Sequence, residues 1–356
     1  MTQPYLKMVA AMISNIIKKW PLVLLVVLAI VSPLLALVLG VANISLADVL
    51  NIFCAQLSDS CEANRLKERI VLELRLPRII LAFLTGAGLA LAGRVLQTVT
   101  RNPLADPYLF GISSGAMFGA VIVISLAGFS VASQGVFSSW AQLGLTGGAF
   151  VGSALSVLLV VSMAGRSVQI ERMVLAGVAT SFMFSAATSL VLYASDPQAA
   201  SSLIFWTLGS FSRASWDTLA IPFVVLIFCF ILFSGFSRQL TALLAGDENA
   251  RSLGVQVQKL RISMLLLTSL LTAILVANTG GIGFVGLMIP HIVRRLYVNY
   301  SRHLMWVTIL FGGVFMVWVD VLSRTLIHGH ELPIGVITAA FGSVFFLLVM
   351  RRKNWS

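Results

Sequence analysis

Charged residues are scarce in this chain. Of its 356 residues, 10% are Asp, Glu, Lys or Arg, whereas soluble domains carry about 25%. Hydrophobic residues make up 58%, and several uncharged apolar runs approach the ~20 residues that cross a bilayer as a helix. Backbone polar groups in lipid must be satisfied internally, which favours helices. The composition therefore excludes a soluble globule and predicts an all-α membrane protein.

Acidic and metal-binding residues are also few, with 13 Asp and Glu, four His and three Cys. No paired acids, metal cluster or nucleophile beside a base is visible, so we expect no catalytic residue and no metal site. A secondary transporter driven by an ion gradient usually carries an acid or histidine in mid-membrane. Most apolar runs lack one, and Asp320 lies near the outer end of its run. A secondary transporter is nevertheless the alternative class.

A Walker A motif, Gly-x-x-x-x-Gly-Lys-Ser/Thr, is missing, so any ATP chemistry must come from another polypeptide. The net charge of +11 is spread between the apolar runs. Nucleic-acid binding would require a basic face on a polar domain, so no nucleic-acid partner is expected. These basic residues are better interpreted as topology signals.

Ten apolar runs predict about ten transmembrane helices, some short and broken, in a single domain over residues 1–356. The first, beginning at Pro21, is too long for the h-region of a signal peptide. With both termini cytoplasmic, most Lys and Arg residues fall in inner loops, as the positive-inside rule requires. An outer segment then covers 43–78 and an inner segment 239–258. The predicted spans are 20–42, 79–99, 109–129, 145–165, 173–194, 217–237, 260–278, 283–298, 303–322 and 333–350.

Helix-breaking residues gather at two places, around Pro103 and Pro107 and around Pro290, each with glycines nearby. Backbone freed at membrane depth must face protein or a water-filled cavity, which suggests a pathway lining. Close packing of helices by small residues explains the same pattern. Both interpretations stay open from the residues alone.

Seven short motifs occur in an order that resembles the permease subunits of type II ATP-binding-cassette importers for iron siderophores, haem and vitamin B12. The resemblance runs from about residue 70 to the C-terminus. The motifs are Arg75-Leu76-Pro77-Arg78, Asn102-Pro103-Leu104-Ala105-Asp106-Pro107 after Gly93 to Gln97, Gly111-Ile112-Ser113-Ser114-Gly115-Ala116, Leu175-Ala176-Gly177, Ala250-Arg251-Ser252-Leu253-Gly254-Val255, Gly283-Phe284-Val285-Gly286-Leu287-Met288-Ile289-Pro290-His291 and Glu331-Leu332-Pro333-Ile334-Gly335.

The resemblance implies ten helices in a bacterial inner (cytoplasmic) membrane and a second permease subunit, identical or homologous. It also implies two cytoplasmic ATPase subunits and a periplasmic substrate-binding protein. ATP and Mg would sit on the ATPases, with no cofactor in this chain. The expected cargo is an iron chelate, with a ferric siderophore first and haem second; cobalamin is the alternative within the family.

The resemblance also assigns roles to particular residues. Arginines at the outer end would receive acidic groups of the binding protein, although snorkelling interfacial arginines are the alternative. Two short inner helices within Leu240 to Val257 would contact the ATPase, and residues beside the breaks would form the gate. The docking residues are Arg75, Arg78 and Arg324; the coupling residues are Leu244, Gly246, Asp247, Glu248, Ala250, Arg251, Leu253 and Gly254; the gate residues are Asn102, Leu104, Ile170, Glu171, Pro290 and His291. Ile170 and Glu171 differ from the small polar residues of some members.

Cysteine and histidine pairs in the outer loops give two further hypotheses. Cys54 and Cys61 share the outer segment, where an oxidising compartment permits a disulfide, although two free thiols are the alternative. Cys229 lies within a predicted span and should be a buried thiol. His328 and His330 are candidates for haem or metal contact, because imidazole is a common ligand; a solvated loop is the alternative.

Overall fold

The computed structural model describes residues 3–40, 42–58, 64–107, 111–126, 139–164, 170–195, 204–297, 304–327 and 329–351. Within these ranges the regular structure is entirely helical. The helices are α1 (Gln3–Val38), α2 (Leu46–Leu57), α3 (Arg65–Arg69), the π-helix η1 (Ile70–Arg75), α4 (Leu76–Val99), α5 (Ile112–Leu126), α7 (Ser139–Ala164), α8 (Ile170–Ala194), α10 (Trp216–Gly235), α11 (Ser237–Leu244), α12 (Asp247–Ser252), α13 (Val257–Thr279), α14 (Val285–Leu296), α15 (Leu304–Thr325) and α16 (Ile334–Arg351).

Each predicted span corresponds to a helix, and seven helices among the described residues are long and apolar enough to cross a membrane. The other three are α5, α7 and α14. In α5 and α7 the apolar part is shorter than in those seven helices and covers Ile112–Ser125 and Gly147–Met163. The prediction of a span over 283–298 was too long, because α14 has 12 residues. At 1.5 Å per residue it rises only about 18 Å, which makes it a broken helix.

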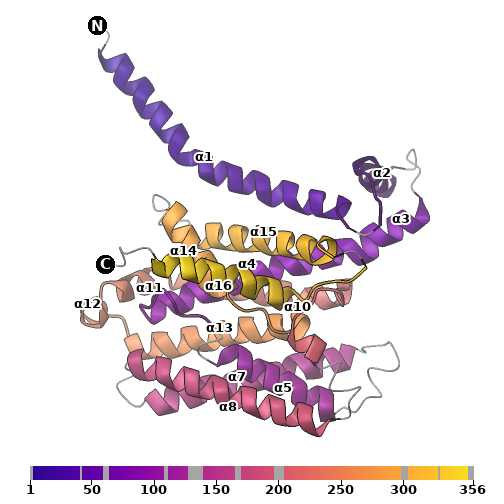
Figure 1. The fold of residues 1–356 in the computed structure, drawn as a ribbon. Helices are drawn as coiled ribbons and strands as arrows, with labels where there is room; N and C mark the ends of the chain where they lie inside the picture. Colours follow the sequence, from indigo (N-terminus) through magenta and orange to yellow (C-terminus); the bar gives the residue numbers. More distant parts are fainter. Residues whose placement is uncertain are drawn as a thin grey trace.

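The helices form one elongated bundle with two distinct ends (Figure 1). The short helices α11 and α12 lie at the same end as the C-terminus, and α2 and α3 lie at the other. Following the predicted orientation, these are called the inner and the outer end. Helices α5, α7 and α8 pack together along one side, while α1 lies along α15 on the opposite side.

Helix α4 is the centre of the bundle because its glycines allow close crossings. The apolar window of the helix that contains α4 is 83% buried, compared with 22% for α16. A Cβ atom at Gly93 would lie 1.9 Å from the carbonyl oxygen of Gly286 in α14, and one at Gly86 would lie 2.1 Å from that of Gly312 in α15. Small residues therefore set the interhelical distance, as is common in membranes.

The outer segment predicted at 43–78 contains α2, α3 and η1, and the last two continue without interruption into α4. Residues 65–99 form a single helix of 35 residues, so the predicted start at 79 was late. Charged residues in the first turns of this helix lower the local hydropathy, so hydropathy does not show where the helix begins. Helix α2 begins with a capping box, in which Ser45 and Asp48 exchange hydrogen bonds.

The break between α13 and α14 is stabilised by backbone from two other parts of the chain. Gly280 and Phe284 both have positive φ, at 73° and 67°. The Ser210 amide donates to the Thr279 carbonyl at 2.8 Å, and the Gly281 amide donates to the Thr207 carbonyl at 3.2 Å. The amides of Ile334 and Gly335 donate in turn to the carbonyls of Gly209 and Leu208, both at 2.9 Å. Irregular backbone within the bundle is thus satisfied by protein, which membrane depth requires.

Candidate functional site

The outer end holds a buried cluster of opposite charges. Arg78, at the start of α4, donates from Nε to Oδ1 of Asp320 in α15 at 2.7 Å. Its Nη1 donates to Oε1 of Glu331 at 2.7 Å. Arg324, one turn after Asp320, forms a second ion pair with that carboxylate, at 3.0 Å. Asp320 is completely buried, so this outer charge cluster (Arg78, Asp320, Arg324, Glu331) joins α4, α15 and the segment before α16.

Two arginines of the same region also satisfy the end of α1. Arg75 donates to the carbonyl oxygens of Leu37 at 2.5 Å and Ala42 at 2.7 Å. Arg324 approaches the carbonyl oxygens of Leu39 and Ala36 at 3.3 and 3.4 Å. The last carbonyls of a helix lack intrahelical partners and carry partial negative charge. The arginines therefore cap α1 and fix it to the bundle.

The three predicted docking arginines lie together, as expected, but deep in the chain. Arg75, Arg78 and Arg324 are only 6%, 8% and 6% exposed. Their guanidinium groups mainly serve contacts within the chain, so a docking role stays a prediction. Glu331 was not assigned a role from the sequence, although it opens the Glu-Leu-Pro-Ile-Gly motif. Its side chain is 45% exposed, so it is the member of the cluster nearest to a partner.

An outer cavity of about 230 Å³ lies beside Glu331. Trp206, Ser210, Asn278 and Thr279 contribute polar and aromatic groups to its wall, and Arg213 also lines it. The wall thus comes from the same backbone segments that satisfy the break after α13.

At the inner end, α11 and α12 form the two short helices that the resemblance implied. Gly246 separates them with φ of 109°, and Gly254 follows α12 with φ of 81°. Side chains rarely adopt these conformations, which explains glycine at both positions. The amide of Val255 donates back to the Ala250 carbonyl at 3.0 Å. This closes the end of α12, and together α11 and α12 make a compact projection.

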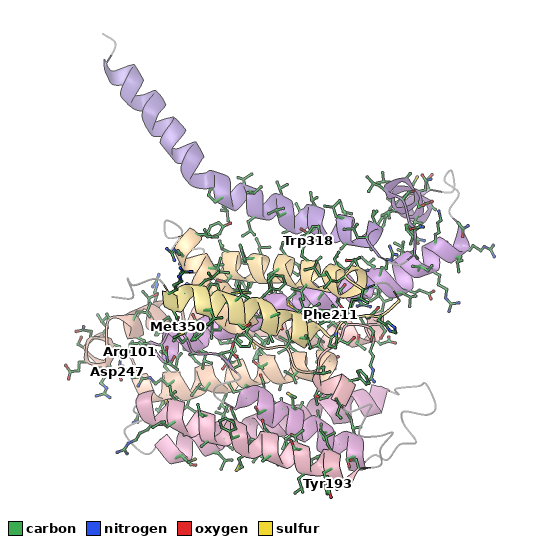
Figure 2. All side chains as sticks on the ribbon, in the orientation of Figure 1. Arg101, Tyr193, Phe211, Asp247, Trp318 and Met350 are labelled. Carbon is green, nitrogen blue, oxygen red and sulfur yellow. The ribbon has the colours of Figure 1, made fainter. Side chains whose placement is uncertain are left out.

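Asp247 holds this projection to the bundle. Both of its carboxylate oxygens accept from Arg261 of α13, at 2.9 and 2.8 Å, and Arg101 after α4 pairs with it at 3.1 Å. Figure 2 shows Arg101 and Asp247 together at the inner end. Arg101 has a φ of 50°, a conformation that costs free energy for a non-glycine residue. This inner clamp (Arg101, Asp247, Arg261) thus connects α12 to α4 and α13.

The predicted coupling residues divide into inward and outward groups. Ala250 is fully buried, with Leu243 beneath α11, so it supports the projection and presents no contact surface. Leu244 and Leu253 are 56% and 71% exposed. Glu248 and Arg251 are exposed between them. These exposed leucines are available for contact with another protein, and a coupling role for them stays a prediction.

The predicted gate residues lie at several places. Asn102 accepts from the Leu104 amide at 2.9 Å and so shapes the turn after α4. Pro290 and His291 lie in α14, where His291 contacts the ring of Phe345 edge-on at 5.6 Å. Ile170 and Glu171 begin α8, and their side chains are outside the described part. A gating role for these residues therefore stays a prediction.

An apolar cavity of about 510 Å³ lies close to the predicted breaks, between the turn after α4, α14 and α16. Its wall includes Asp106, Phe284, Leu287, Ala339 and Phe346. Gln97 of α4 donates to the carbonyls of Gly286 and Leu287 at 3.2 Å. The break and the turn after α4 are therefore adjacent, which agrees with a pathway along this side.

The structure describes only some of the residues in the remaining cysteine and histidine predictions. Cys229 is a buried free thiol, as predicted. Cys54 lies in α2, but Cys61 falls outside the described residues, so their bond stays a prediction. His330 is exposed, and His328 is outside the described part.

Comparison with known proteins gives a consistent family assignment. The model of the FecCD transport family matches residues 25–352. The hemin transport system permease protein HmuU of Yersinia pestis is 35% identical over 80% of this chain and 84% of its own length. The molybdate import system permease protein MolB of Haemophilus influenzae is 33% identical over 93% and 95%. A solved structure described as a metal-chelate type ABC transporter in an inward-facing conformation is 32% identical, with a TM-score of 0.77, and covers 92% and 97%.

The match extends over almost the whole chain and agrees with an all-helical membrane permease fold. It also adds molybdate to the cargoes of relatives, which the sequence motifs did not suggest. The protein is thus a multi-pass membrane permease of an ABC importer and belongs to the FecCD transport family.

Proposed function

We propose that this permease subunit moves an iron chelate, either a ferric siderophore or haem, from a periplasmic binding protein to the cytoplasm across a bacterial inner membrane. ATP and Mg bind to two partner ATPase subunits, and a second permease completes the pathway. The names of the hemin permease and the metal-chelate transporter support a chelate cargo. The molybdate relative makes molybdate an alternative, beside cobalamin.

The projection of α11 and α12 is the single observation that carries the ATP-driven mechanism. Its surface exposes Leu244 and Leu253, and Asp247 ties it to α4 and α13 through two arginines. Movement of a bound ATPase is then transmitted to the helix at the centre of the bundle. A ligand or partner shifts a conformational equilibrium only by interacting differently with its states, and a rigidly held contact serves that purpose.

Docking of the binding protein is proposed at Glu331 and the outer charge cluster behind it. An acidic group of the binding protein would compete with Glu331 for Nη1 of Arg78, while the completely buried Asp320 keeps its own contact. Charge pairs of this kind favour specificity and encounter rate more than affinity. Glu331→Gln should therefore raise the association rate by removing the competing acid.

Reconstitution with a panel of cargoes tests the proposal. The permease complex with its ATPase and binding protein is placed in proteoliposomes, and uptake of a ferric siderophore, haem, cobalamin and molybdate is compared. We expect ATP-dependent uptake of a chelate at least tenfold above the other cargoes. Preference for molybdate or cobalamin would refute the cargo, and uptake that follows an ion gradient without ATP would refute the mechanism.

A further inference from the structure

A cavity at the inner end lies against α11, one of the two helices of the coupling projection. It measures about 210 Å³ and lies between α4, α10, α11 and α15. A water molecule takes about 30 Å³ of liquid, so a phosphate group fits within it. The lining residues are Arg94, Val95, Thr98, Ser234, Ser237, Leu240, Thr241, Leu244, Met305 and Trp306.

Arg94 is the charged residue of this cavity. It lies in α4, within a membrane-spanning helix, and its Nη1 atom is buried without a hydrogen-bond partner. Its guanidinium makes no ion pair within the described part of the chain. The nearby charge of Arg294 is also positive, and Arg294 is bonded to Oε1 of Gln97. Arginine in a membrane span is costly unless it is paired, so an anion in this cavity would be stabilised.

Hydroxyl groups surround the arginine. Thr98 and Thr241 each donate to a carbonyl one turn back, at 2.9 and 2.8 Å. Ser234 makes only a 4.0 Å contact with the sulfur of Met305, and the Ser237 hydroxyl has no hydrogen bond within the described residues. Ser234 and Ser237 are therefore able to donate to a ligand, and phosphate oxygens accept several such bonds at once.

The edge of the cavity is apolar and lies exposed on the surface of the chain. Trp306 is 56% exposed and packs on Phe230, with their ring centroids 4.2 Å apart. Leu244 on the other side is 56% exposed as well. Tryptophan is enriched where membrane helices meet the interface. A polar, cationic cavity with an apolar edge at this depth matches a lipid headgroup and the start of its acyl chains.

We propose that this cavity, the Arg94 pocket, binds the phosphate group of an anionic phospholipid of the cytoplasmic leaflet. Arg94 forms the charge-assisted hydrogen bonds, and Ser234 and Ser237 donate further ones. Basic pockets between helices on this side of a membrane are typical headgroup sites. Since Leu244 and Thr241 of α11 also line the pocket, the bound lipid would support the coupling projection.

Native mass spectrometry of the permease complex in detergent measures this binding directly. Phosphatidylglycerol, phosphatidylethanolamine and inorganic phosphate are titrated separately. We expect phosphatidylglycerol to bind at least tenfold more tightly than the other two. Arg94→Gln should weaken phosphatidylglycerol at least tenfold, and Ser237→Ala, which keeps the charge, about fivefold. Arg295→Gln removes an exposed arginine at the end of α14 and should change nothing.

Each other outcome contradicts the proposal. Equal affinity for the two lipids, or phosphatidylglycerol binding unaffected by both Arg94→Gln and Ser237→Ala, would overturn it. Binding of inorganic phosphate as tight as that of the lipid would assign the pocket to free phosphate. If Arg94→Gln released the ATPase while lipid binding stayed the same, the anion would be a carboxylate of the ATPase. If Arg94→Gln does not fold, the effect of Ser237→Ala on phosphatidylglycerol binding tests the proposal instead.

Discussion

The outer charge cluster and the inner clamp use the same chemistry with different exposure. At the outer end, Asp320 is completely buried between Arg78 and Arg324. At the inner end, the Asp247 side chain keeps 25% of its surface exposed while pairing with Arg261 and Arg101. Breaking a buried ion pair leaves an uncompensated charge, whereas exposed pairs contribute little. The outer cluster is therefore mainly structural, and the inner clamp positions a contact.

The largest effect in this comparison is expected for Asp320→Asn. It leaves Arg78 and Arg324 buried without their shared carboxylate and should destabilise the protein by about 3–5 kcal/mol. Thermal unfolding of the purified permease in detergent measures this loss. Glu331→Gln is the matched control, and its cost should stay below about 1 kcal/mol because Glu331 is 45% exposed. Equal losses for both variants would show that burial does not distinguish the two acids.

Asp247→Asn should mainly impair transport. It removes the charge that holds α12 against Arg261 and Arg101, so we expect ATP-driven uptake to fall about tenfold. The cost in stability should be about 1–3 kcal/mol, smaller than that of Asp320→Asn. Uptake and ATP hydrolysis are measured in proteoliposomes, with Glu248→Gln on the exposed face of α12 as the control. Full uptake by Asp247→Asn would mean that the clamp does not position the projection.

Gly246→Ala tests the shape of the same projection. A side chain at φ of 109° and ψ of 158° is strained even where space is available, at a cost of about 1–3 kcal/mol. We expect a partial loss of uptake, about threefold, without loss of insertion into the membrane. Gly235→Ala is the control, because its Cβ meets no atom within 4 Å and its φ is not positive. The same uptake for the two variants would argue against a defined turn.

The smallest effect concerns the proposed bond between Cys54 and Cys61. It would join one short part of the outer segment, away from the inner clamp, so Cys54→Ser should leave uptake within about twofold of the original. Thiol labelling of the denatured protein, with and without reductant, reveals the bond directly. Labelling that does not increase after reduction would exclude it and leave the outer end dependent on its ion pairs.

The sequence predicted the helical membrane fold because long apolar runs require it, and the family resemblance located the two inner helices, which Gly246 separates. It missed the uninterrupted helix of 65–99, since the charged first turns resemble a loop. Hydropathy also extended α14 beyond its 12 residues.

The outer charge cluster could not be predicted from the sequence, for a different reason. Arg78 is 242 residues from Asp320 and 253 from Glu331, and no local pattern reports such a pairing. The motif marked the arginines for an external partner, whereas the fold first uses them to hold α1, α4 and α15 together. Similarly, Ala250 belongs to the coupling motif but packs inward.

We propose that ATP-driven movement enters this permease through the projection, at the exposed Leu244 and Leu253. The most direct measurement is chelate uptake into proteoliposomes by the complex carrying Leu244→Ser and Leu253→Ser, with ATP hydrolysis recorded in the same vesicles. We expect ATP-dependent uptake to fall at least tenfold while the permease stays folded and inserted. Undiminished ATP-dependent uptake with the ATPase still bound would contradict it.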